Sequence, residues 1–302
     1  MPSQSAELSL PADLGRASLL IGVGRHAEAI RLLGAVLATA PDSSRGWCLL
    51  ARARLGTADY PAAVAAAARA AALDPADDWP YRLASTGLVG AGRAADAVTA
   101  AVEARRLAPH FWRSQLCLAQ AAVAAGRLDL AADAAAAAMA LAPDQADVHV
   151  SAGKVALARG DVGEARRRQA AALAIEPAHS SAINEMGRIS LRCRDLGGAA
   201  EYFLHAARTA PGVGVFGRNS ELALRRLAVW LAAPLLLAAM CCVAAAALDL
   251  ARRPAGAAAL AVGAWIALAW IALRLRSVPR GVRAALARTS TRRWRRISPH
   301  KS

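Results

Sequence analysis

Proline recurs along this 302-residue chain at a fixed interval of 34 residues, at Pro41, Pro75, Pro109, Pro143, Pro177 and Pro211. A fixed period of this length indicates a chain of repeated units that stack on one another, and it constrains the fold more than any single motif does. With proline as position 32 of each repeat, the period divides the chain into six repeats: 10–43, 44–77, 78–111, 112–145, 146–179 and 180–213.

Three other positions of the repeat hold small residues. Position 20 is alanine in every repeat, position 8 is Ala, Ser or Gly, and position 27 is alanine except for Val36. Small side chains at fixed spacing allow two antiparallel helices to approach closely. Glycine recurs between the two helical stretches, at Gly24, Gly92, Gly126 and Gly160. The first helix must end there in a turn with φ > 0, and the proline then ends the second helix.

The composition agrees with an all-α chain. With only three Phe and three Tyr, the core must consist of Ala, Leu and Val, and such a core favours helices over strands. The stretch AAVAAAARAAALDP at 62–75 falls on the second helix of the second repeat. There Ala63 and Ala70 occupy close-packing positions, and Ala66 is expected on an open face.

These spacings resemble the tetratricopeptide repeat (TPR) family. In the second repeat the resemblance rests on Trp47, Leu50, Ala51, Asp59, Tyr60, Ala63, Ala70 and Pro75. It covers residues 10–213 and implies a solenoid of helix pairs that binds protein partners. Asp13 and Arg16 depart from the pattern in the first repeat, and Arg194 replaces the turn glycine in the sixth, as expected of capping repeats. The excess of Arg over Lys, 35 to 2, suggests a GC-rich, actinobacterial-like genome.

In the TPR family, positions 2, 5, 9, 12 and 13 of each repeat line the concave groove. The resemblance therefore assigns these groove residues: Arg45, Arg52, Arg82, Arg113, Gln120, Lys154, Asn184, Arg188 and Arg192. The thirty groove positions hold seven basic residues and one acid, Asp147. We expect a positive groove that binds an acidic protein or peptide. Asn184 is the only Asn in the set, so the Lys-and-Asn carboxylate clamp of chaperone-binding relatives is not expected.

Two apolar runs follow the repeats. Residues 227–248 contain no charge over 22 residues, which is enough to span a hydrocarbon core about 30 Å thick, and residues 255–273 form a shorter second run. We expect a transmembrane hairpin with a short loop at 249–254, preceded by a linker and helix start at 214–226. Two buried helices of a globular domain are the alternative. Before the repeats stands a lead of residues 1–9.

One short motif near this junction resembles a nucleotide-binding loop. GVGVFG at 212–217 matches GxGxxG, but it follows a helix-ending proline rather than a strand. We expect it to be a flexible joint.

Positive charge is concentrated after the repeats. Residues 1–213 carry 22 Lys+Arg against 20 Asp+Glu, whereas residues 214–302 carry 15 against 2. The basic tail at 274–302 should remain cytoplasmic, which places both chain ends and the repeats in the cytoplasm at an inner or plasma membrane. With Leu275, Val282 and Leu286 beside them, the tail arginines are expected to meet anionic lipid. They are Arg274, Arg276, Arg280, Arg283, Arg288, Arg292, Arg293, Arg295 and Arg296.

The same tail raises a second hypothesis, a membrane tether for nucleic acid. Only Trp294 is available there for base stacking, which disfavours that hypothesis.

The residue types that carry catalysis are scattered. Five cysteines lack a CxxC or His-linked spacing, and the six histidines lie apart with no HExxH or nucleophile motif. We expect no catalytic residue, no cofactor and no metal, although an enzyme with an unrecognised site stays a remote alternative. The sequence predicts a non-enzymatic, membrane-anchored scaffold or adaptor.

Overall fold

The computed structural model of the chain describes residues 4–210, 213–247 and 254–287. Every regular element in these ranges is a helix, so the all-α prediction is confirmed. The chain divides into two compact bodies: an N-terminal body, Met1–Ala182, and a C-terminal body, Ile183–Ser302. The division falls inside α11 (Ser180–Arg192), and each body is described by itself.

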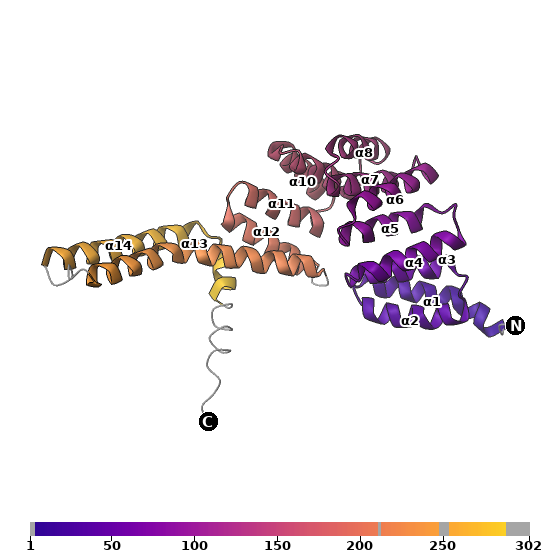
Figure 1. The fold of residues 1–302 in the computed structure, drawn as a ribbon, viewed down its shortest axis with the longest axis horizontal. Helices are drawn as coiled ribbons and strands as arrows, with labels where there is room; N and C mark the ends of the chain where they lie inside the picture. The colour runs from indigo at the N-terminus through magenta and orange to yellow at the C-terminus, as the bar shows by residue number, and fades with distance from the viewer. Residues whose placement is uncertain (1–3, 211–212, 248–253, 288–302) are drawn as a thin grey trace, which may run out of the picture. The chain divides into compact units, whose positions relative to one another are not determined.

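Ten helices form the N-terminal body, which also includes the start of α11, and Figure 1 shows them stacked in chain order. They are α1 (Gln4–Gly22), α2 (His26–Thr39), α3 (Ser44–Gly56), α4 (Tyr60–Leu73), α5 (Asp78–Gly90), α6 (Ala94–Leu107), α7 (Trp112–Ala124), α8 (Leu128–Leu141), α9 (Ala146–Ala158) and α10 (Val162–Ile175). The C-terminal body continues with α12 (Leu196–Thr209), α13 (Gly214–Ala247) and α14 (Pro254–Ser277). Residues 280–287 form a further helical stretch.

The turn within each helix pair has a positive φ at repeat position 15. Gly24, Gly92, Gly126 and Gly160 have φ between 70° and 86°, which confirms the predicted turns. Ala58 and Arg194 adopt the same conformation at 58° and 60°. The backbone path of the repeat therefore holds even where a side chain makes that conformation unfavourable.

Several second helices begin at an aspartate that caps them. The Asp59 side chain accepts a hydrogen bond from the backbone N–H of Ala62, and Asp161 accepts one from Glu164 at 2.8 Å. Asp195 caps α12 in the same way. A carboxylate here satisfies an amide that has no partner within the helix, which fixes where the helix starts.

Three different side chains link successive helix pairs in the N-terminal body. Each stands at repeat position 4 and bonds the carbonyl of the preceding repeat's proline. The bonds join Trp47 Nε1 to Pro41 O at 2.7 Å, Gln115 Nε2 to Pro109 O at 3.1 Å, and His149 Nε2 to Pro143 O at 2.8 Å. Because each proline lies in the turn after a second helix, these bonds tie the end of one repeat to the first helix of the next.

Alanine provides much of the N-terminal core. Ala63, Ala67 and Ala70 on α4 are completely buried, as the close-packing interpretation requires for Ala63 and Ala70. Ala66, however, is only 3% exposed, so the prediction that it lies on an open face is wrong. It belongs to a cluster with Cys48, Ala51 and Leu83, because the next helix pair covers that side of α4.

The C-terminal body has a core built around Phe203 of α12. This core includes Ala223 and Leu227 of α13, and Val278 and Val282 beyond α14. The predicted flexible joint is wrong from Gly214 onward, because α13 begins there and runs unbroken to Ala247. Phe216, in its first turn, is only 5% exposed, and burial of this ring favours helix over a flexible joint.

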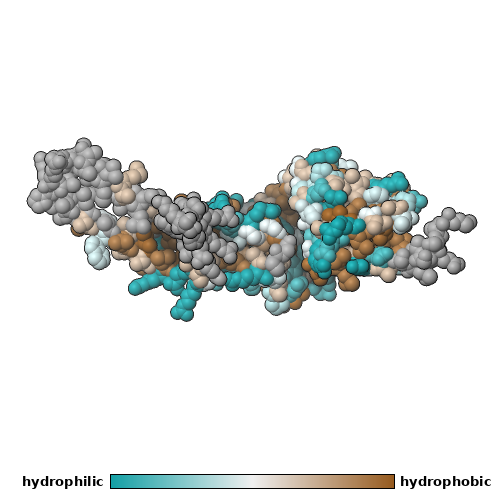
Figure 2. All heavy atoms as spheres, turned by 90° about the horizontal axis from the view of Figure 1, so that it is seen from below, coloured by the Kyte–Doolittle hydropathy of each residue, from teal (hydrophilic) through white to brown (hydrophobic). Residues whose placement is uncertain are grey.

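Within the part of the chain that the structure describes, no helix is both long enough and apolar enough to cross a membrane. The side chains at 234–238 and 241–260, which make up much of both apolar runs, lie outside that part. Among the described residues, α13 and α14 nonetheless expose large apolar side chains. They are Val215, Leu222, Val229, Met240, Val262, Trp265, Ile266, Leu268 and Leu273. Figure 2 shows apolar residues in brown at the surface here, beside hydrophilic residues in teal.

Candidate partner-binding surface

The first helices of the repeats present a regular set of polar side chains to solvent. At positions 2 and 9, Arg45, Arg52, Arg113 and Gln120 are exposed, and Lys154 is half-buried. Positions 2 and 9 are seven residues apart, or about two turns, so they lie on one face of each helix. These five predicted residues all belong to the N-terminal body.

Position 5 behaves differently, because its side chains turn inward. Cys48 is fully buried, Val150 is 4% exposed and Asn184 is 6% exposed. The Asn184 side-chain oxygen accepts a hydrogen bond from Asn219 Nδ2 of α13 at 2.9 Å. Asn184 was expected to line the groove, but its side chain is buried and hydrogen-bonded to Asn219 instead.

Arg82 is also engaged within the protein. Its Nε lies 2.5 Å from an Asp78 carboxylate oxygen, and the same oxygen accepts a hydrogen bond from Ser114 Oγ at 2.8 Å. Its guanidinium lies 5.0 Å from the centre of the Phe111 ring. Because this ion pair is largely shielded from solvent, Arg82 contributes little positive charge to an external ligand.

Arg113 remains at the surface while stacking on a neighbouring ring. Its guanidinium lies 4.3 Å from the centre of the Trp112 ring, a cation–π geometry that orients the charge without neutralising it. Arg113 thus combines a fixed orientation with an exposed charge.

The one acid among the groove positions forms an ion pair. His179 Nε2 lies 3.1 Å from a carboxylate oxygen of Asp147. Their hydrogen bond lowers the pKa of Asp147 and raises the pKa of His179. The backbone N–H of Ala182 donates to His179 Nδ1 at 3.2 Å. The proton facing Asp147 is therefore on Nε2 when the ring is neutral.

Three of the nine predicted groove residues belong to the C-terminal body. Arg192 is exposed, whereas Arg188 pairs with the buried carboxylate of Glu185 at 2.8 Å. Arg188 therefore pairs with an acid of its own helix. That acid, Glu185, is not at one of the groove positions. The sequence gives no sign of this pair beyond the i, i+3 spacing.

The basic tail is described only in its first part. Arg274, Arg276, Arg280 and Arg283 are exposed, while Arg288, Arg292, Arg293, Arg295 and Arg296 lie outside the described residues. Val282, which lies among the described arginines, is 1% exposed and packs in the core around Phe203, so it does not face outward beside them.

Arg274 lies beside two tryptophans at one end of the two apolar runs. Its guanidinium lies 4.4 Å from the Trp230 ring and 4.7 Å from the Trp270 ring, and the two rings are 5.2 Å apart. Trp230 begins the first run and Trp270 closes the second, so α13 and α14 are antiparallel neighbours here. The sequence gave no sign that these two tryptophans meet.

The described residues offer little for covalent or metal chemistry. Burial raises the pKa of the Cys48 thiol to about 12, which leaves it protonated and unreactive at neutral pH. In the same ranges, no group of three His, Cys, Asp or Glu side chains is placed to hold a metal ion.

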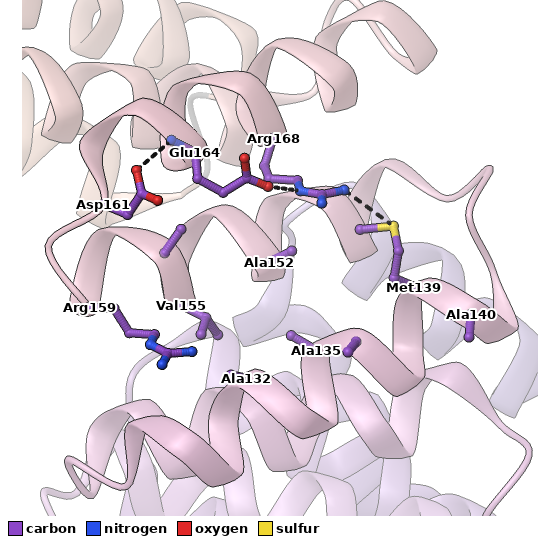
Figure 3. A pocket seen from close by; sticks show the side chains of 12 residues that line it. Ala132, Ala135, Met139, Ala140, Ala152, Val155, Arg159, Asp161, Glu164 and Arg168 are labelled. Carbon is purple, nitrogen blue, oxygen red and sulfur yellow. Dashed lines mark hydrogen bonds and ion pairs between the residues drawn. The ribbon is translucent and has the colours of Figure 1, made fainter.

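A pocket between α8, α9 and α10 was not predicted from the sequence (Figure 3). Its signal was present in the sequence as alanine at positions 21, 24, 25 and 29 of the fourth repeat, namely Ala132, Ala135, Ala136 and Ala140. A methyl group at each of these positions leaves space that a larger side chain would fill.

Comparison with protein families identifies the repeats. Residues 20–83 and 83–146 each match a family model described as tetratricopeptide repeat. These residues form tetratricopeptide repeats. The described helices make an all-α TPR-like solenoid, and TPR domains are in general non-enzymatic modules that bind other proteins. No curated protein matches the sequence.

Several solved structures share this fold at low sequence identity. A thermophilic TPR protein of Thermus thermophilus is 21% identical with a TM-score of 0.53, covering 63% of this chain and 98% of its own. A tetratricopeptide repeat protein from Parabacteroides merdae is 12% identical with a TM-score of 0.61, covering 72% and 84%. The APC/C hetero-tetramer Cut9–Hcn1 gives 16% identity and a TM-score of 0.57, covering 91% and 55%. At these identities the likeness extends to the fold alone.

Proposed function

We propose that this protein is a membrane-anchored TPR scaffold whose repeats bind an acidic segment of a partner protein. The observation that carries the proposal is the exposure of Arg45 and Arg52 on α3 and of Arg113 on α7, at the positions that face the groove in two of the first helices. Among the described residues, neither Arg45 nor Arg52 has an ion-pair partner, so both charges are available to a ligand carboxylate.

The positive surface proposed here is smaller than the sequence suggested. Arg82 and Arg188 pair with Asp78 and Glu185, and the six repeats as a whole are nearly neutral. An exposed cluster of this kind contributes mainly to the rate of association and to the choice of partner, and it is screened by salt. The acidic partner should therefore bind more weakly as ionic strength rises.

A peptide titration of the full chain tests this surface. A Glu-rich peptide should bind more tightly than a Lys-rich peptide of equal length. Arg52→Glu should weaken the Glu-rich complex by about tenfold, or about 1.4 kcal/mol. Arg69→Glu is the matched control, because Arg69 is exposed on the second helix α4 and should change the affinity by less than about twofold. Equal binding of the two peptides would refute the proposal.

The anchor is proposed to be a hairpin of residues 227–248 and 255–273. Their length and lack of charge support it, as do the exposed apolar side chains Val262, Ile266 and Leu268 on α14. Trp230, Trp270 and Arg274 would then lie at the cytoplasmic interface, where tryptophan and arginine are favoured. The tail arginines would contact anionic lipid head groups from the same side.

The topology is testable with a single introduced thiol. Arg252→Cys, in the short loop between the runs, should react with a membrane-impermeant maleimide added outside spheroplasts. Cys193, exposed in the C-terminal body, should react only after the membrane is opened. Labelling of Cys193 in intact spheroplasts would contradict cytoplasmic repeats, and release of the protein by alkaline carbonate would contradict the anchor.

A further inference from the structure

A pocket of about 580 Å³ lies between α8, α9 and α10 (Figure 3). Side chains of Ala135, Met139 and Val155 contribute to its apolar lining, and charged side chains from α10 and from the end of α9 complete it. A volume of this size falls in the range of pockets that hold a ligand or a large side chain.

The pocket exists because α8 presents methyl groups where another repeat presents larger side chains. Repeat positions 21 and 24 hold Ala132 and Ala135 here, whereas the first repeat holds Ile30 and Leu33. Met139 is the longest apolar side chain in the lining, and its thioether is flexible enough to adapt to an occupant. The site therefore accepts apolar groups of more than one shape.

Most charged groups of the lining are already used within the protein. Glu164 lies 2.5 Å from Arg168 Nε, and Asp161 caps α10 through the amide of Glu164. The Arg168 guanidinium also approaches the Met139 sulfur at 4.0 Å. These groups form a closed network that offers little to an external charge.

Arg159 is the exception. Among the described residues its ionic contact is with Asp129 at 3.7 Å, and the Asp129 side chain is 98% exposed, so solvent screens that contact. Figure 3 shows the Arg159 side chain extending from the end of α9 along the pocket. An incoming carboxylate can therefore replace Asp129 at small cost while its apolar neighbour enters the pocket.

The pocket is separate from the proposed groove surface. At about 100° per residue, the mean direction of Ala152, Ala156 and Arg159 is about 175° from the mean direction of the five groove positions of the same helix. A partner could occupy the two surfaces independently.

We propose that this pocket is a second docking site, which binds a large apolar side chain of a partner protein next to a carboxylate. The apolar group lies against the alanines of α8 and α9, and the carboxylate pairs with Arg159. An anchor side chain buried in a preformed pocket is the arrangement that dominates affinity at many protein interfaces. The proposal does not depend on the groove or on the anchor.

Methionine-methyl NMR of the full chain in detergent tests the proposal. The sequence has four methionines, and of these Met139 lines the pocket while Met240 is exposed on α13. N-acetyl-tryptophan and its amide serve as probes that differ only in the carboxylate. Both should shift the Met139 signal saturably, and the acid should bind about threefold more tightly than the amide. The Met240 signal reports partition of the probe into the micelle.

Three variants and one control variant separate the parts of the site. Ala136→Leu should fill the pocket and weaken both probes at least about tenfold. Ala140→Leu repeats this test should the first variant not fold. Arg159→Gln should remove the preference for the acid while leaving the amide unchanged. Ala68→Leu, at the same repeat position as Ala136 and also exposed, should change nothing.

The opposite results would overturn the proposal. They are a Met139 signal that does not respond, binding that survives both filling variants, or a preference for the acid that persists without Arg159.

Discussion

The middle repeats and the last repeat differ in how the two helices of a pair pack against each other. Repeat position 24 is fully or nearly buried throughout, yet it holds Ala67, Ala101 and Ala135 in the middle and Phe203 at the end. Position 8 on the facing helix varies in the opposite sense, with Gly187 opposite Phe203. The backbone path is the same, and the long side chains Gln169 and Phe203 are accommodated at position 24 because each faces glycine at position 8.

The difference in side-chain size at positions 8 and 24 affects stability. A Cβ added at Gly187 would come within 2.7 Å of the Phe203 ring, whereas the middle repeats have Ala51, Ser85 and Ala119 at that position and alanine opposite. At these two facing positions the last repeat buries an aromatic ring, whereas the second, third and fourth repeats bury only small side chains. These positions therefore contribute less buried apolar surface in the middle of the solenoid, where the pocket at α8 lies.

The largest expected effect comes from removing the ring. Phe203→Ala should lower the free energy of unfolding of the C-terminal body by about 3–5 kcal/mol, because it leaves a cavity among Ala199, Leu227 and Val282. Denaturant titration of the full chain, with hydrogen exchange to locate the change, measures this effect. A loss under about 1 kcal/mol would mean that the last repeat is no better packed than the middle ones.

The reciprocal change sharpens the comparison. Gly187→Ala alone should destabilise by about 1–3 kcal/mol through overpacking against Phe203. The same substitution in a Phe203→Ala background should be neutral or stabilising, because the pair then matches the middle repeats. A double-mutant cycle measures the coupling, and strict additivity would show that the two positions do not share one space.

The fifth repeat lies between these two types and places a polar group in the core. Gln169 is fully buried at position 24, its Nε2 donates to Val150 O at 3.2 Å, and its Oε1 has no hydrogen-bond partner in the described residues. Gln169→Leu should raise the free energy of unfolding by about 1 kcal/mol, because an unsatisfied buried acceptor is costly. Gln169→Ala is the control for side-chain volume. Destabilisation by leucine would mean that Oε1 is satisfied in solution.

The smallest expected effect concerns the ion pair of Asp147 and His179. The pKa of His179 is raised from 6.5 in the folded state, so its stabilising contribution is full below pH 6.5 and is lost as pH rises through the folded pKa. The pKa of Asp147 is lowered from 3.8, so its contribution is present above pH 3.8 and is lost as pH falls through the folded pKa.

Denaturant titrations at two pH values can detect this small term. His179→Gln should therefore cost more at about pH 5.5 than at about pH 8.5, by about 0.5 kcal/mol or less, since Asp147 is half exposed to solvent. An equal cost at both pH values would exclude a protonated His179 from the pair.

The helical fold was predictable because its determinants are local and repeated. Proline at position 32, the turn at position 15 and alanine at position 20 each act within a single helix pair, and the period made them visible. Contacts between neighbouring pairs were not predictable in the same way. The burial of Ala66 and Cys48 depends on the next repeat, and the capture of Asn184 depends on Asn219, 35 residues away.

The charge of the candidate surface was the least predictable feature. Assigning residues by position counted Arg82 and Arg188 as free cations, because Asp78 and Glu185 stand at positions outside the groove set. Side chains reach about one helical turn, so an acid at i−4 or i−3 can neutralise a groove arginine from another face. The pocket at α8 was not predicted for a related reason. A run of alanines in the sequence shows that the side chains are small, but not which helices enclose the space that they leave.

Flotation of reconstituted vesicles tests the central claim of a membrane-anchored scaffold with a positive partner surface. The full chain is reconstituted into vesicles containing anionic lipid, mixed with a labelled Glu-rich peptide, and floated through a density gradient. We predict that the protein floats, that the peptide floats with it, and that Arg52→Glu releases the peptide while Arg69→Glu does not. Protein that stays at the bottom of the gradient, or peptide that floats equally well with Arg52→Glu, would contradict the account.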